Sequence, residues 1–216
     1  VYKRQIILGG CTYVLNKTSG QIYEQMSQMA QLYAQELDNR FLRISRNLFS
    51  TIMDTNETNS TFYGNVNLMK NGDYSEYAIG KLREEYFSSA WEYGTEYRIF
   101  LYTHDTDKLY QLSLSSDGNY TMSPDIAASI REQIDKLDEK TYAVKRKWDV
   151  LECDNEVYIC KIAQKNGIAL GCIVNVKSIL EPFSKLSLGK HGYVSLVDQD
   201  EVCIGMLDPV SYTHLT

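Results

Sequence analysis

The sequence predicts an α+β fold in which a long N-terminal helix packs on an antiparallel sheet. Two observations carry this prediction. Apolar residues recur at spacings of three and four from Ile22 to Ile52, which is the period of one face of a helix. The dipeptide Asn166-Gly167 joins two strand-like segments directly, as in a two-residue β-hairpin whose central positions both adopt positive φ.

The chain begins with an apolar segment. Residues 6–15, IILGGCTYVL, carry no charge, but a membrane-spanning helix needs about 20 apolar residues. We interpret residues 6–20 as the end of a transmembrane helix; a buried strand and a signal-peptide core are the alternatives. Residues 1–5, VYKRQ, and residues 209–216, PVSYTHLT, resemble translated sequencing-adapter tails, so we exclude both from fold reasoning.

The amphipathic helix that ends near Ile52 either starts at about Thr18-Ser19 or continues from the apolar segment. A periodic helix of about thirty residues is longer than most globular helices, which favours a membrane stalk, a coiled-coil seam or both. The alternative is the spine of a soluble domain, which also places this helix against the sheet.

The middle of the chain predicts alternating helices and strands. We expect, in order, a helix at Ala78–Tyr93 stopped by Gly94, strands at Tyr97–Thr103 and Lys108–Leu114, a helix at Asp125–Leu137 opened by Ser123-Pro124, and strands at Trp148–Cys153 and Glu156–Ala163 around the turn Asp154-Asn155. Elements mixed in this order indicate helices packed on an antiparallel sheet.

The Asn166-Gly167 turn also predicts a strand register in which the numbers of opposite residues sum to 333. Cys160 and Cys172 then point to opposite faces of the sheet. Because a disulfide needs converging Cβ atoms, both are expected to be free thiols. The predicted partners are Tyr158 with Asn175, Cys160 with Ile173, Lys161 with Cys172, and Ile162 with Gly171.

A short helix is expected after this hairpin, at Ile179–Leu186, with Ser178 as its N-cap and Pro182 in its first turns. Gly189 would end it. Residues 192–198 are then expected to form a strand that begins a second unit.

Composition and motifs exclude several classes of function. The net charge of −6 and the lack of a basic stripe argue against nucleic-acid binding. The five cysteines form no CxxC pair, so neither a zinc site nor a disulfide framework is predicted. The three histidines are scattered, and no nucleotide-binding or HExxH motif occurs. We therefore expect no catalytic residue, no metal site and no cofactor in this chain.

The order of elements resembles the extracellular double Cache sensor region of bacterial membrane receptors, in particular Gram-positive sensor histidine kinases that work with AraC-type response regulators. The most specific part is residues 158–204, where 167–176, 177–188 and 192–197 correspond to the last distal strand, the connecting helix and the first membrane-proximal strand. The resemblance implies a PAS-like distal module at 21–188 and the start of a truncated proximal module at 189–208. Asp200-Glu201 stands where the family's proximal turn usually has a glycine.

The same resemblance implies a sensor at the cell membrane, on its extracytoplasmic side, in a homodimer with flanking membrane helices. A small-molecule ligand would bind the distal module and shift the long helix, and any catalysis would occur elsewhere in the parent protein. The alternatives are a chemoreceptor, a cyclic-dinucleotide enzyme, or a lipoprotein-type solute-binding domain. The last is favoured by the sequence LGGC, which ends at Cys11 and resembles a lipobox.

The resemblance also places a ligand pocket between the sheet and the segments that cover one of its faces. Arg98 and Asp149 are the candidate polar anchors. A role in the hydrophobic core is the alternative for Trp91 and Trp148. The full set of candidate ligand contacts is Trp91, Tyr97, Arg98, Tyr102, Tyr110, Trp148, Asp149 and Tyr158.

Overall fold

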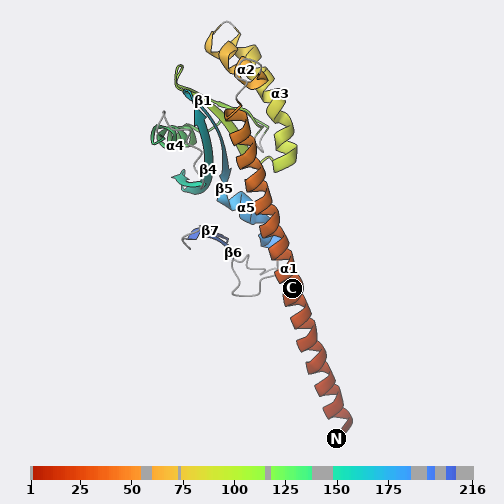
Figure 1. Cartoon of the computed structure of the whole chain (residues 1–216). Helices are drawn as coiled ribbons and strands as arrows, with labels where there is room; N and C mark the ends of the chain where they lie inside the picture. The colour runs from red at the N-terminus through yellow and green to blue at the C-terminus, as the bar shows by residue number, and fades with distance from the viewer. Residues whose placement is uncertain are drawn as a thin grey trace.

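The computed structural model confirms the α+β fold class, with a long helix and a five-stranded antiparallel sheet covered by helices on both faces (Figure 1). It describes residues 2–54, 60–72, 74–114, 118–137, 148–185, 194–197 and 203–207. Side chains are described within these ranges except at residues 2–20, 22–23, 87–92, 184–185 and 207. The suspected tail at 209–216 lies outside the described residues, whereas residues 2–5 begin the first helix.

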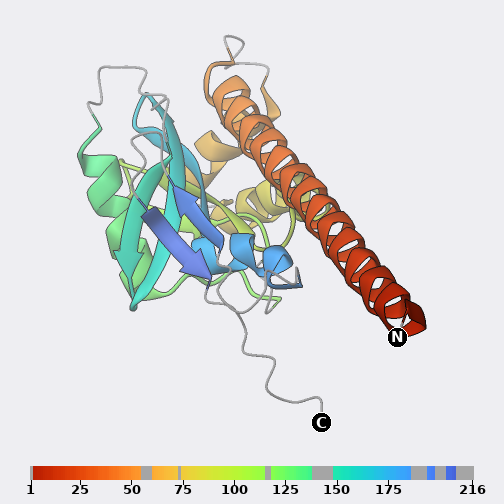
Figure 2. The same cartoon turned by 90° about the horizontal axis from the view of Figure 1, so that it is seen from below.

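Helix α1 runs without interruption from Tyr2 to Ile52. The apolar and amphipathic segments therefore share one helix, because no proline breaks the chain between them. The C-terminal part of α1 packs on the body of the protein and buries Ile44, Leu48 and Ile52, whereas its N-terminal part extends away from the sheet (Figures 1 and 2). No helix in the described part of the chain combines the length and the apolar character that a membrane span requires.

Two helices follow α1 and form an antiparallel pair at one end of the molecule (Figure 1). Sequence analysis identified α3 (Ser75–Tyr93), which ends at Gly94 with φ of 108°, but missed α2 (Thr61–Lys70). α2 is tied to the end of α1 by the Tyr63 hydroxyl, which donates to the Ile52 carbonyl oxygen at 2.6 Å. The α2–α3 pair adds its apolar side chains to the same hydrophobic cluster as α1.

The sheet has the strand order β2-β1-β5-β4-β3, with every neighbouring pair antiparallel. β2 is shorter than predicted because the chain leaves the ladder at Leu112. The N–H groups of Leu112 and Ser113 both donate to the Ile99 carbonyl, at 2.8 and 3.4 Å, and Ser113 Oγ accepts the Ile99 N–H at 2.7 Å. The strands are β1 (Tyr97–Thr103), β2 (Lys108–Gln111), β3 (Asp149–Cys153), β4 (Glu156–Lys165) and β5 (Ile168–Asn175).

The predicted β4–β5 register is confirmed. Asn166 and Gly167 have φ of 53° and 71°, as a two-residue hairpin turn requires. Cys160 and Cys172 are free thiols, buried in separate hydrophobic clusters on opposite faces of the sheet. The observed partners are Tyr158 with Asn175, Cys160 with Ile173, Lys161 with Cys172, and Ile162 with Gly171.

The two faces of the sheet are covered by different helices. The cluster on one face includes side chains of α1, α2 and α3. On the other face, α4 (Pro124–Asp135) buries Ile126, Ile130 and Ile134 against the strands. Ser123 caps α4 as predicted, since its Oγ accepts the Ile126 N–H at 3.3 Å and Pro124 occupies the first helical position.

The helix after the β4–β5 hairpin starts earlier than predicted. α5 spans Val176–Leu180, and Asn175 Oδ1 accepts the Lys177 N–H at 2.8 Å. The prediction of Ser178 as the cap is wrong, because asparagine is an equally good N-cap and occurs first, at the end of β5. Pro182 lies in the 3-10 helix η1 (Glu181–Lys185) that follows, and the predicted stop at residue 189 lies outside the described residues.

A separate two-stranded antiparallel sheet consists of β6 (Val194–Val197) and β7 (Cys203–Leu207). β6 falls within the strand predicted at 192–198. A Cβ atom on Gly205 would lie 2.5 Å from Val176 Cγ1, so β7 lies directly against α5. The turn at 200–201 lies outside the described residues.

Candidate ligand cavity and its link to the long helix

A cavity of about 620 Å³ lies at the end of the sheet where β4 begins and β5 ends. The strands and α4 contribute Arg98, Ile126, Glu156, Tyr158, Ile173 and Asn175. The remaining wall comes from α1, from the segment before β1, and from α5 and η1, through Tyr33, Thr95, Glu96, Lys177, Ser178, Glu181 and Pro182. These segments meet because the start of β1 and the start of β4 both flank the end of β5 in an antiparallel sheet.

One side of the cavity is a hydrogen-bonded group built around Glu156. The Tyr158 hydroxyl and the Asn175 amide both donate to Glu156 Oε2, at 2.9 and 2.6 Å. Burial, followed by the bond to Glu156, raises the pKa of the Tyr158 hydroxyl, which therefore stays protonated as a donor. Asn175 also caps α5, so the same residue that starts this helix orients the carboxylate of Glu156.

Arg98 stands on another side of the cavity. Its side chain is half-buried and makes no ion pair or hydrogen bond with any residue in the described part of the chain. Ile126 and Ile173, which are 3% and 1% exposed, supply an apolar surface in the same cavity. A guanidinium in this setting is a ready donor for a carboxylate or another acceptor of a bound solute.

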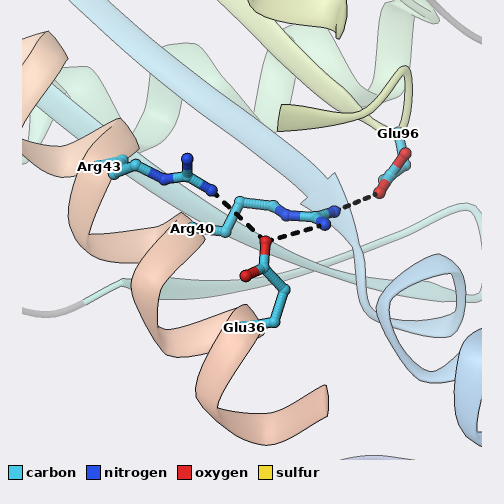
Figure 3. Close-up of polar contacts among 4 residues, drawn as sticks. All are labelled: Glu36, Arg40, Arg43 and Glu96. Carbon is cyan, nitrogen blue, oxygen red and sulfur yellow. Dashed lines mark hydrogen bonds and ion pairs between the residues drawn. The ribbon is translucent and has the colours of Figure 1, made fainter. Parts of the chain in front are cut away.

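The cavity is connected to α1 by two sets of contacts. The ring of Tyr33, which lines the cavity, lies 5.5 Å from the ring of Phe183 in η1. Glu96 lines the cavity as well, and it accepts a hydrogen bond from Arg40 of α1 at 3.2 Å. Figure 3 shows that Glu36 extends this link, because both Arg40 and Arg43 donate to it at 3.4 Å.

Behind this ion pair, aromatic rings join α1 to the sheet. The Phe41 ring lies 6.3 Å from that of Tyr97 and 4.7 Å from that of Trp148. The Arg40 guanidinium also lies 5.7 Å from the centre of the Tyr97 ring. Burial raises the pKa of Tyr97, although the Arg40 charge opposes this shift. The contact between α1 and the start of β1 is thus both apolar and charged.

The structure separates the candidate ligand contacts. Arg98 and Tyr158 line the cavity. Tyr97, Tyr110 and Trp148 belong to the cluster on the α1 face instead. The Trp91 side chain lies outside the described side chains.

The other two candidates lie away from the cavity wall on the α4 side of the sheet. Tyr102 is near the opposite end of the sheet, where its hydroxyl donates to Asp107 at 3.0 Å and its ring lies 4.9 Å from that of His104. Asp149 is on the edge strand β3, opposite Cys160. Neither residue lines the cavity that contains Arg98.

Sequence analysis missed Glu156 and Asn175, although the hairpin register contained a signal for them. Tyr158 was a candidate, Asn175 was its predicted partner, and Glu156 lies two residues before Tyr158 on the same face of the strand. No such signal existed for Thr95, Glu96 and Lys177, because the bends that bring them to the cavity lie outside the strands.

No protein-family model, curated protein or solved structure matches this chain. The cavity itself therefore has to indicate the function. The residues that line it include no histidine or cysteine, and the described residues contain no cluster of three or more side chains suited to hold a metal ion. Its hydrogen-bond donors and acceptors, set around an apolar surface, are suited to bind a small polar solute.

Proposed function

We propose that this chain is the ligand-sensing region of a membrane receptor of the double Cache type, on the extracytoplasmic side of the cell membrane, with a sensor histidine kinase as its output. The observation that supports the proposal is the wall that the cavity shares with α1. Tyr33 lies on that wall, and Glu96 joins it to Arg40. A solute in the cavity would therefore contact the helix that leaves the body of the protein.

The proposed signal is a change in the preferred position of α1. The Arg40 and Glu96 side chains are 27% and 32% exposed, so their ion pair is worth about 0.2–1 kcal/mol and biases an equilibrium by at most about fivefold. A larger bias requires that the solute also change the contact between Tyr33 and Phe183. A ligand shifts the equilibrium between two positions of α1 only to the extent that it binds the protein more tightly in one of them.

A homodimer is part of the proposal. Leu32, Leu42 and Phe49 of α1 are 65%, 48% and 45% exposed, although they are large and apolar. They are separated by ten and seven residues, which places them near one stripe of a coiled-coil helix. A second copy of α1 would cover this stripe and would allow a shift in one copy to be transmitted to its partner.

The proposal is tested by ligand binding and by the response of α1. Thermal unfolding of the chain is measured with a panel of amino acids, organic acids, amines and sugars. A true ligand at a hundredfold excess over its Kd stabilises the folded state by about 2.7 kcal/mol, and Arg98→Gln reduces this effect. Hydrogen exchange of the α1 backbone at residues 33–43 is then compared with and without that ligand.

The expected result is ligand-dependent exchange within this part of α1. Binding that leaves the exchange of α1 unchanged would contradict the sensing role and favour a solute-binding domain, which is the lipoprotein alternative. A chemoreceptor or a cyclic-dinucleotide enzyme shares the expected result, so the output module is identified separately, by sequencing the parent gene. Failure of every solute in the panel to bind would refute the proposal.

A further inference from the structure

The cavity has two charged groups of opposite sign that do not neutralise each other. Arg98 has no ionic partner among the described residues. Glu156 accepts hydrogen bonds from two neutral donors, the Tyr158 hydroxyl and the Asn175 amide, and forms no ion pair with another residue that the structure describes. Arg98 is half-buried and Glu156 is exposed, so a ligand that supplies a charge of opposite sign to each would form charge-assisted hydrogen bonds with both.

The strand register explains why Arg98 and Glu156 do not form a pair. Arg98 is opposite Ile173 on β5, and Ile173 is opposite Cys160 on β4. Glu156 lies four residues before Cys160 on the same strand. Two strand spacings and four residues separate the two Cα atoms by about 16 Å, which is too far for a direct ion pair between these side chains.

The surface between the two charges is apolar. Ile173 lies between their strands, and Ile126 of α4 lines the same cavity. Of the other charges in the lining, Glu96 is paired with Arg40, and Lys177 and Glu181 are exposed residues of opposite sign. The wall thus presents a positive end, an apolar middle and a negative end.

We propose that the cavity binds a small amino carboxylic acid whose charges lie at opposite ends of a short apolar chain. The carboxylate is held by Arg98, the ammonium group by Glu156, and the methylene groups cover Ile126 and Ile173. This inference rests on the proposed function, because it names the class of solute that is sensed. A simple anion would leave Glu156 without a partner, and a simple amine would leave Arg98 without one.

The experiment measures the binding of four matched solutes to the chain by titration calorimetry. 5-Aminopentanoate carries both charges at opposite ends, pentanoate lacks the ammonium group, pentylamine lacks the carboxylate, and norvaline carries both charges at one end. We expect 5-aminopentanoate to bind about tenfold or more tightly than each of the others, because each missing charged hydrogen bond costs about that much affinity.

Variants then assign each end of the ligand. Arg98→Gln should weaken 5-aminopentanoate about tenfold and leave pentylamine unchanged, whereas Glu156→Gln should weaken 5-aminopentanoate and leave pentanoate unchanged. Arg46→Gln and Glu152→Gln are the matched controls, since both residues are exposed and lie outside the cavity lining. Melting temperatures of all four variants establish that they are folded.

The outcomes separate this inference from the proposed function. Equal affinity for pentanoate and 5-aminopentanoate, or tighter binding of norvaline, would overturn the inference while leaving a ligand-binding cavity in place. The same conclusion follows if all four solutes fail to bind but a sugar or another member of the wider panel binds and alters the exchange of α1. Binding that is insensitive to both Arg98→Gln and Glu156→Gln would place the ligand elsewhere and overturn the inference.

Discussion

Neighbouring residues of the same strand lie on opposite faces of the sheet and have different roles there. On the α1 face, Tyr97 packs with Phe41 of α1, whereas on the α4 face Arg98 lines the cavity. Tyr97 and Arg98 are adjacent in β1, but successive side chains in a strand point to opposite faces. Residues that are adjacent in sequence therefore divide between a structural core and a candidate site.

The two faces also differ in whether their polar groups are paired with one another or line a cavity. The α1 face near β1 is closed by aromatic rings and the Arg40–Glu96 ion pair. The α4 face is apolar beneath α4 but opens beyond Ile126 into the cavity, where Glu156 and Arg98 face solvent-accessible space. Stability is thus expected to depend mainly on the α1 face, and ligand binding on the open end of the α4 face.

The largest expected effect is on the α1 face. Leu48→Ala removes a side chain that is 1% exposed and should lower the free energy of unfolding by about 2–5 kcal/mol. The matched control is Leu42→Ala, on the same helix but 48% exposed in the single chain, which should change the free energy of unfolding by less than about 0.5 kcal/mol at a protein concentration low enough to keep the chain monomeric. Urea denaturation of both variants gives the two values. Equal losses would mean that α1 is covered equally on both sides and would undermine the contrast.

The next effect tests the packing of the α4 face. Gly171 lies opposite Phe100 and Ile162, and a Cβ atom there would approach Lys161 O to 2.8 Å and the Phe100 ring more closely still. Gly171→Ala should therefore cost about 1–3 kcal/mol of stability, measured by thermal unfolding.

Gly64→Ala is the control for this glycine. Gly64 lies within α2, and nothing would lie within 4 Å of its new Cβ atom, so alanine should stabilise the protein by about 0.5–1 kcal/mol. The prediction is that the two substitutions change the stability of the protein in opposite directions. A neutral Gly171→Ala would show that Phe100 and the α4 face repack easily.

A smaller effect tests the residue that joins the sheet to the cavity. Asn175→Ala removes the N-cap of α5 and a donor to Glu156, and it should cost about 0.5–2 kcal/mol in chemical denaturation. Ser178→Ala should be close to neutral in the same measurement. If the serine substitution were the more costly of the two, Ser178 rather than Asn175 would be the N-cap of this helix.

The smallest effect concerns the ion pair that joins Arg40 of α1 to Glu96, in the segment before β1. A double-mutant cycle of Arg40→Gln and Glu96→Gln should give a coupling energy of about 0.2–1 kcal/mol, which falls as salt is added. Arg43→Gln with Glu96→Gln is the control pair and should show no coupling, because Arg43 is bonded to Glu36 instead. A coupling above this range would make the pair a larger contributor to signalling than we propose.

Much of the fold was predictable from local patterns. The β4–β5 register followed from Asn166-Gly167, and the start of α4 followed from Ser123-Pro124, because each signal acts within a few residues. α2 was missed because its ten residues form too short a periodic segment to stand out. The early end of β2 was missed because it depends on a hydrogen bond between Ser113, which follows β2, and Ile99 of β1, 14 residues earlier in the chain.

The candidate site was predicted only in part. Arg98 and Tyr158 were among the predicted contacts and do line the cavity, but Tyr97 and Trp148 pack against α1. Aromatic residues at strand positions indicate that the side chain is buried, but they do not indicate on which face of the sheet it lies. The face is decided by where the helices dock, and that information is spread over residues far apart in the chain.

The sequence by itself determined the α+β class, the amphipathic character of α1, the hairpin register and the separation of Cys160 from Cys172. These features follow from periodicity and turn chemistry, which are local properties of the chain. Only the tertiary structure decided that α1 covers the face of Tyr97, that Glu156 and Arg98 share a cavity, and that Glu96 reaches Arg40. These depend on burial and on contacts between distant segments, whose energies exist only once the sheet and helices have packed.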